Sequence, residues 1–160
     1  MASRLRQIVE SMAETLGSSD YFNTAPIIPV VVEDSKDVIR EIDHASGKAH
    51  GAFALVGFDT ADTDNESPGP FLSECTFNVS IVEFPSIWRS SRRDAPSCTE
   101  IAEAAARLLH HTEPLDIDGN KIGNGVLSFV SMTPTFDESS LTQTVSFSFP
   151  LVLSTSVPTR

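Results

Sequence analysis

Within residues 71–84, polar and apolar side chains alternate strictly from Glu74 to Ile81, and this pattern constrains the fold of the chain more than any other. One set of alternate positions holds Phe71, Cys75, Phe77, Val79 and Ile81. The other set holds Glu74, Thr76, Asn78 and Ser80. Side chains on a strand alternate between its two faces, so the pattern predicts a long strand with one packed face. We expect the other face to meet water or a neighbouring subunit.

A helix predicted at 97–111 would cover that packed face. Ser97 and Glu100 have the spacing of a capping box, in which each side chain accepts a hydrogen bond from the other residue's backbone N–H. An apolar stripe follows at Ile101, Ala104, Ala105, Leu108 and Leu109. Glu103 and Arg107 are four residues apart on the exposed side, where they can form an ion pair. His110 and His111 add positive charge near the C-terminal end of the helix dipole.

The remaining elements are predicted from the same periodicities. In chain order they are a helix at 3–16, a strand at 27–32, a short helix at 36–45, a strand at 52–58, a small hairpin around Asp118-Gly119, and strands at 126–136 and 141–153. Pro29 predicts that the strand at 27–32 lies at a sheet edge or begins late. The relative orientation of the strands within 27–58 is left open.

These elements predict an α+β fold in a single domain spanning 1–160. The expected sheet is curved, mostly antiparallel, four- to five-stranded, and packed against two main helices. Residues 1–2 and 154–160 are expected to be loose, and 59–70 to form a mobile acidic loop. A chain of 160 residues, 40% hydrophobic and 21% charged, can bury enough surface to fold without a disulfide or a metal.

The net charge of −11 limits the classes of partner. An acidic surface repels phosphate backbones and anionic lipids, so neither sequence-specific nucleic-acid binding nor membrane binding is expected. The first 16 residues contain Glu10 and Glu14 and lack the apolar core of a signal peptide. No apolar run approaches the roughly 20 residues of a membrane-spanning helix. We therefore expect a cytoplasmic protein.

The sequence contains no recognisable catalytic constellation. It has no nucleophile elbow, no phosphate-binding glycine loop and no dinucleotide fingerprint. Cys75 is predicted on the apolar face of a strand, and Cys98 at a helix start, where the helix dipole can lower a thiol pKa. A disulfide between them stays open, although a reducing cytosol favours two free thiols. We predict no enzyme activity and no cofactor.

Two sets of polar residues superficially suggest metal sites. Adjacent His110 and His111 point about 100° apart on a helix and cannot share one metal there. Asp116, Asp118 and Asn120 have the spacing of a calcium loop, but Lys121 and Leu127 stand where glycine and a bidentate glutamate are needed. We predict no metal site.

One basic, aromatic-bearing segment is the candidate contact site. It contains Trp88, Arg89, Arg92 and Arg93. Tryptophan and arginine are enriched among the residues that anchor interfaces. Since the protein is acidic, a second copy is a suitable partner. In that hypothesis the arginine segment meets the acidic loop of the next copy, which contains Asp59, Asp62, Asp64 and Glu66.

The order of elements resembles that of the small tail-terminator and tail-completion (minor tail) proteins of long-tailed bacteriophages and prophages. The similar features are an N-terminal helix, the segment Pro-Ile-Ile-Pro-Val-Val-Val, and a short helix containing Val38-Ile-Arg-Glu-Ile42. A long strand then ends in Val82-Glu-Phe-Pro85, followed by an arginine-bearing loop, the helix from Glu100 to His110, and a final hairpin. The resemblance covers about 5–153 and is one of pattern.

The resemblance implies a structural role. Such proteins have a curved sheet packed on two helices and assemble as homo-oligomeric rings, often hexamers. These rings cap the tail tube and meet the head connector, so tail-tube and connector proteins are the implied partners. The implied locations are the host cytoplasm during assembly and then the virion tail. The resemblance also implies no catalytic residue and no cofactor. The alternative is a monomeric module that binds a small ligand or a protein, with a pocket between sheet and helix, and the third possibility is a small enzyme.

Overall fold

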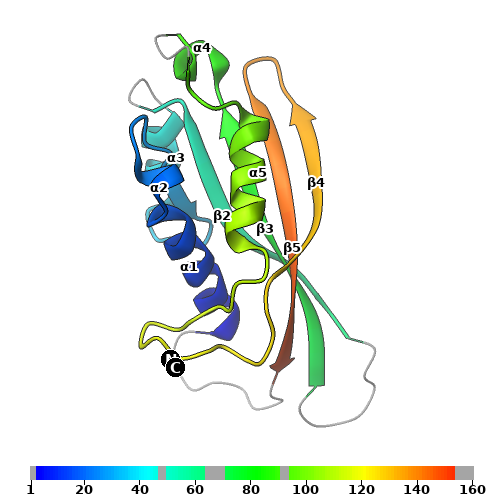
Figure 1. The fold of residues 1–160 in the computed structure, drawn as a ribbon. Helices are drawn as coiled ribbons and strands as arrows, with labels where there is room; N and C mark the ends of the chain where they lie inside the picture. Colours follow the sequence, from blue (N-terminus) through cyan, green and yellow to red (C-terminus); the bar gives the residue numbers. More distant parts are fainter. Residues whose placement is uncertain (1–2, 47–49, 64–70, 91–93, 154–160) are drawn as a thin grey trace.

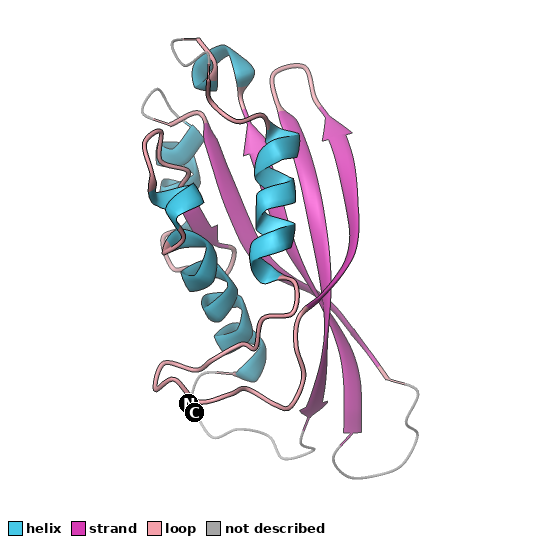
Figure 2. Cartoon of the chain, in the orientation of Figure 1, coloured by secondary structure: helices cyan, strands magenta, loops and turns pink. Residues whose placement is uncertain are grey.

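A computed structural model describes residues 3–46, 50–63, 71–90 and 94–153 (Figure 1). The elements in chain order are α1 (Arg4–Gly17), α2 (Asp20–Asn23), β1 (Val30–Val32), α3 (Val38–Ser46), β2 (Ala52–Asp62), β3 (Phe71–Glu83), α4 (Pro85–Trp88), α5 (Cys98–Leu109), β4 (Ser128–Phe136) and β5 (Leu141–Leu153). Figure 2 shows the long helices together in front of one twisted sheet. The α+β prediction is confirmed.

The five strands form one sheet in the order β1-β2-β3-β5-β4. β1 runs parallel to β2, and the other neighbouring pairs are antiparallel. β1 is an edge strand that begins after Pro29, as the proline predicted, because proline cannot donate to a strand ladder. β4 is the other edge. β5 lies between β3 and β4 and pairs with β3 over its whole length.

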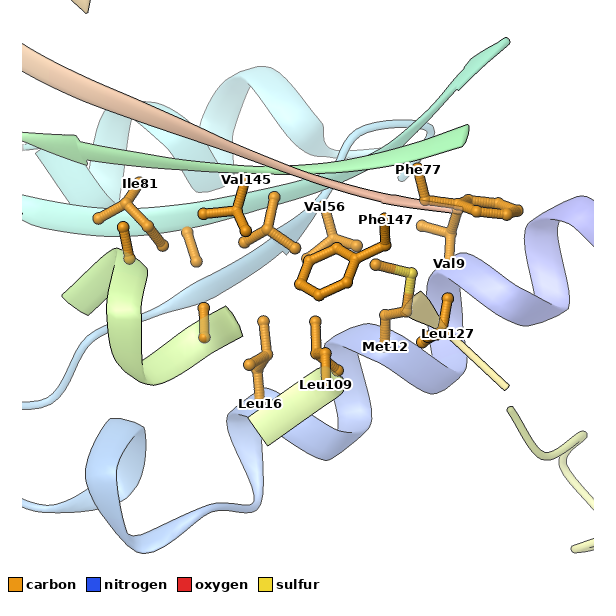
Figure 3. Close-up of a cluster of buried hydrophobic side chains, with 14 of the residues drawn as sticks. Val9, Met12, Leu16, Val56, Phe77, Ile81, Leu109, Leu127, Val145 and Phe147 are labelled. Carbon is orange, nitrogen blue, oxygen red and sulfur yellow. The ribbon is translucent and has the colours of Figure 1, made fainter. Parts of the chain in front are cut away.

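α1 and α5 pack on one face of the sheet and enclose the main core. The two helices contribute Ile8, Val9, Met12, Leu16, Ile101, Ala102, Ala105 and Leu109, all buried. β3 and β5 contribute Cys75, Phe77, Val79, Ile81, Val145, Phe147 and Phe149, also buried. Figure 3 shows members of both sets, among them Met12, Leu109, Phe77 and Phe147, meeting between the helices and the strands. The alternation predicted for 71–84 is therefore confirmed.

α3 lies on the opposite face of the sheet from α1 and α5 (Figure 3). The cross-strand register places Phe53 and Val31 on this second face, and both are buried together with Ala45 of α3. These three residues lie outside the main core cluster. α3 packs mainly on β1 and β2, so it leaves most of the second face over β3, β5 and β4 uncovered.

That uncovered part of the second face carries small hydroxyl-bearing side chains. Cross-strand rows join Ser80, Thr144 and Thr133, and beside them Asn78, Ser146 and Ser131. The Ser146 hydroxyl donates to Asn78 Oδ1 at 2.9 Å. Neither β4 nor β5 contains a charged residue, although 21% of the whole chain is charged. The strands β5 and β4 at this end of the sheet therefore carry no charge, whereas Glu74 of β3 lies exposed on the same face.

Several predicted boundaries differ from the structure, and β1, α3 and β4 each begin two or three residues later than predicted. β2 continues to Asp62 rather than ending at Phe58, because a bulge between Phe58 and Thr60 lets the pairing with β3 resume. Residues 59–62 are therefore strand and not loop. Residues 85–88 form a helical turn, α4, with Pro85 at its start. α5 ends at Leu109, and His111 adopts a positive φ of 65°.

Candidate contact surfaces

Trp88 is not available to a partner. Its side chain is fully buried in the main core, and its indole Nε1–H donates to Pro96 O at 2.8 Å. Gly51 lies directly beneath α4 with a φ of +80°, and a Cβ there would meet Trp88 N at 2.7 Å. The sequence hypothesis that Trp88 anchors an interface is therefore wrong: the tryptophan fixes α4 to the end of the sheet.

Arg89 joins α4 to a buried carboxylate. Glu83 is the last residue of β3 and is 0% exposed. The guanidinium Nη2 of Arg89 donates to the two carboxylate oxygens at 2.6 and 2.8 Å, and Nε donates to them at 3.0 and 3.1 Å. Glu83 also accepts the backbone N–H of Cys98 at 3.2 Å. Its hydrogen bond with Glu83 raises the pKa of Arg89, so the guanidinium stays charged.

The Glu83–Arg89 pair therefore holds three elements together. β3 supplies the carboxylate, α4 supplies the guanidinium, and the first N–H of α5 supplies the third contact. Sequence reasoning missed Glu83, although it continues the odd-numbered series Cys75, Phe77, Val79 and Ile81 that faces the core. About half of the Arg89 side chain remains exposed. Its charge is engaged within the subunit, so Arg89 is a weaker candidate for an intermolecular contact than the sequence indicated.

Of the other predicted contact residues, two lie in the part of the chain that the structure describes and four lie outside it. Asp59 and Asp62 lie on the exposed C-terminal half of β2, where Asp62 pairs with Glu74 of β3. Asp64 and Glu66, and also Arg92 and Arg93, lie outside the described residues.

The basic and acidic ends of the molecule are far apart. α4 follows the end of β3 that pairs with Ala52, whereas Asp62 is at the other end of the eleven-residue β2. Figure 1 shows α4 at the top and the end of β2 at the bottom. At about 3.3 Å per strand residue, roughly 30 Å separates them. Residues at the two ends can therefore meet only between different copies of the chain.

Both cysteines are free and buried. The Cys98 thiol donates to Ile81 O at 3.2 Å. Burial raises the pKa of Cys98 to about 11, with a smaller lowering from a backbone hydrogen bond. Burial also raises the pKa of Cys75. Two free thiols are what the sequence favoured, and desolvation of the Cys98 thiolate outweighs any lowering of its pKa by the helix start.

We predict that Cys98 is inert in the folded protein. With a pKa of about 11 in place of 9.0, the thiolate population of Cys98 at pH 8 is roughly one hundredth of that of an unperturbed cysteine. Burial also restricts the access of reagents to the sulfur. Alkylation by iodoacetamide at pH 8, followed by peptide mass spectrometry, should be at least about a hundredfold slower in the native than in the denatured protein. Rapid labelling of Cys98 under native conditions would contradict this prediction.

The same shift gives an alkaline pH dependence. The folded-state pKa of Cys98 lies above its reference value of 9.0, so the native state binds this proton more tightly than the unfolded state. The resulting stability is present below pH 9 and is lost as the pH rises toward 11. Replacement of Cys98 by alanine should flatten this loss in urea unfolding measured from pH 7 to pH 11, whereas Val79→Ala, which also opens a buried cavity but removes no ionisable group, should leave it unchanged.

The histidine and aspartate clusters have structural partners. His110 Nδ1 accepts the backbone N–H of Phe129 at 3.0 Å and so fastens the end of α5 to β4. Asp116 Oδ1 accepts the backbone N–H groups of Asp118 and Asn120, both at 2.9 Å, in the predicted tight turn. Within the described ranges no group of three or more His, Cys, Asp or Glu side chains gathers as a metal site would require. In the same residues no helix is long and apolar enough to cross a bilayer.

A hollow of about 410 Å³ lies between the first turns of α1, the residues that follow β1 and the middle of β2. Leu5, Val9 and Phe58 form its apolar wall, and Arg6, Glu33 and Asp34 its polar rim. Arg6 is engaged by Glu10 at 3.0 Å and lies 3.8 Å from Asp34. The hollow can accommodate a small molecule or a side chain, and its rim, with one paired cation and two carboxylates, is net negative.

The edge strand β4 is a surface that sequence reasoning did not identify. It pairs with β5 on one side only, and three of its apolar side chains are exposed: Phe129, Val130 and Phe136. The signal in the sequence is the lack of charge over 128–136. The lack of charge indicates an exposed edge surface only once the strand order places 128–136 at the edge of the sheet.

Comparison with known proteins establishes the fold only. No protein family and no curated protein matches the chain. One solved structure, whose name describes no activity, is similar with a TM-score of 0.54 and 16% sequence identity. The similarity covers 96% of this chain and 98% of the other. At this identity the likeness concerns the arrangement of helices and strands.

Proposed function

We propose that this chain is a structural assembly protein of a phage or prophage tail, which forms a ring that terminates the tail tube or joins it to the head connector. The observation that carries the proposal is the element order. The elements follow one another in the order that the resemblance to tail-terminator proteins implies. That order is a leading helix, a short β1–α3–β2 unit, a long strand, a covering helix and a final hairpin. Two main helices cover one face of the curved sheet, as that resemblance implies.

The distribution of charge supports a head-to-tail contact between copies. Asp59 and Asp62 lie at one end of the sheet, and α4 with Arg89 lies at the other, while Arg92 and Arg93 come three and four residues after Arg89 in the sequence. A contact between two different surfaces of the same subunit generates a ring when the rotation closes. The acidic surface would also let DNA pass such a ring without adhering, because like charges repel.

The ring is tested by reversing the charge of the basic segment. We predict that Arg92→Glu combined with Arg93→Glu reduces the mass measured by size-exclusion chromatography with light scattering from several times 17.3 kDa toward that of one chain. The matched control is Arg40→Glu combined with Arg107→Glu. It changes the net charge equally at two side chains that are each 80% exposed. Equal masses for the two double variants would contradict the head-to-tail contact.

Co-assembly with a tail-tube protein tests the assignment to a phage tail. The wild-type chain should cap purified tubes and stop their growth, as seen by electron microscopy. Tubes that elongate normally in the presence of the chain would argue against this function.

The hollow beside α1 favours the alternative, a monomeric binding module. Its volume suits a small ligand, and both apolar and charged side chains line it. Leu5→Trp, at a partly buried position that lines the hollow, would fill it and should abolish binding of such a ligand. If the protein were monomeric and a small-molecule screen by thermal shift found a ligand that Leu5→Trp no longer bound, the module would replace the ring.

A further inference from the structure

The edge of β4 is unusually open for a strand of its length. It has nine residues and no charged side chain. Exposed edges offer unpaired backbone N–H and C=O groups to other strands, and proteins usually protect them with lysine, proline, bulges or a covering element. Within the described residues, β4 is protected by the hydrogen bond from Phe129 N–H to His110 Nδ1, a bulge between Phe129 and Ser131, and one proline, Pro134. Phe136 is 71% exposed at the end of the strand.

We propose that β4 pairs antiparallel with β4 of a second copy, so that two five-stranded sheets become one continuous sheet across a two-fold axis. The first argument is matched length. β4 offers nine residues, whereas the opposite edge strand β1 offers only three. A two-fold contact uses the same surface on both copies, so the two partners are equal in length and polarity.

The second argument is electrostatic. A protein of charge −11 repels its own copies, and the least costly approach is through a surface without charge. β4 and β5 together form such a surface. Elsewhere in the described chain, acidic side chains occupy α1, α3, α5 and the end of β2.

The positions of the nearest acidic residues select the antiparallel direction. Asp137 and Glu138 follow β4 immediately, while the segment 122–127 before it has no charge. In a parallel pair the two acidic turns would lie side by side. In an antiparallel pair each acidic turn lies beside the uncharged segment of the other copy, about 30 Å from its own counterpart.

This contact goes beyond the proposed ring, because it relates two copies by a two-fold axis through a different surface. If only the ring formed, the Arg92→Glu and Arg93→Glu double variant would lower the measured mass, and substitutions in β4 would leave that mass unchanged. The edge contact alone would give a two-chain species of about 35 kDa, twice the chain mass, that the arginine variant leaves intact.

The test places a charge on the edge. We expect Phe136→Lys to raise the dissociation constant of the two-chain contact at least about tenfold in analytical ultracentrifugation, since the lysine would occur twice in the interface. The matched control is Ile39→Lys, because Ile39 on α3 is also 71% exposed and lies on another surface. Equal dissociation constants for the two variants, or no wild-type association through β4 at any soluble concentration, would overturn the proposal.

Cross-linking tests the strand direction. Full antiparallel overlap places Ser131 of one copy opposite Thr133 of the other, with Met132 at the centre. A mixture of Ser131→Cys and Thr133→Cys chains should therefore form a disulfide under mild oxidation, and Ile117→Cys chains, at a fully exposed loop position, should not. If the mixture does not cross-link although the two-chain species persists, β4 is not the contact.

Discussion

Replacement of Trp88 by alanine is expected to lower the free energy of unfolding by about 3–5 kcal/mol. The indole is fully buried beneath α4, and its removal leaves a large cavity and an unpaired Pro96 carbonyl. Chemical denaturation followed by circular dichroism measures the change, because the variant lacks the only tryptophan.

Trp88→Phe is the control for this substitution. It keeps most of the buried volume and loses the hydrogen bond to Pro96, so we expect a loss of roughly 1–2 kcal/mol. If Trp88→Ala cost less than the phenylalanine variant, or left stability unchanged and instead weakened self-association, the tryptophan would have the contact role that the sequence suggested.

The second large effect is expected at Arg89. Arg89→Ala leaves the buried Glu83 carboxylate with the Cys98 N–H as its one remaining described partner. Breaking a buried pair costs about 3–5 kcal/mol. The Arg89 side chain is 45% exposed, so water can reach the carboxylate and we expect about 2–3 kcal/mol.

Two variants separate this pairing effect from a general loss of charge. Arg107→Ala removes an exposed ion pair with Glu103 and should cost less than about 0.5 kcal/mol. Combining Arg89→Ala with Glu83→Met removes both charges and should recover part of the lost stability. Urea unfolding midpoints of the variants give the comparison, and an Arg89→Ala effect no larger than that of Arg107→Ala would refute the pairing.

Periodicity predicted most of the fold. The alternation in 71–84 and the stripe from Ile101 to Leu109 correctly identified β3, α5 and the core between them, because burial of one face imposes its period on the sequence. The Ser97 cap and the Glu103–Arg107 pair were also correct, since both depend on residues close in sequence.

The errors arose where contacts are distant in sequence. Trp88 stands beside arginines in the chain, yet Gly51 and Pro96 surround it in space. The parallel direction of β1 and the placement of α3 on the second face follow from the sheet order, which periodicity does not encode. The openness of β4 depends on the same order. The candidate contact surfaces were consequently only partly predictable.

The position of β5 between β3 and β4 has a consequence for how the chain folds. β2 with β3, and β4 with β5, are hairpins whose strands follow one another directly and can form by local encounter. The seam between β3 and β5 joins residues about sixty to eighty positions apart, and such distant pairings are slow because chain closure costs entropy before contacts repay it. We therefore expect folding to be limited by the meeting of two preformed hairpins. Substitutions along the seam, such as Val145→Ala, should mainly slow folding, whereas those at the β4 edge should mainly speed unfolding.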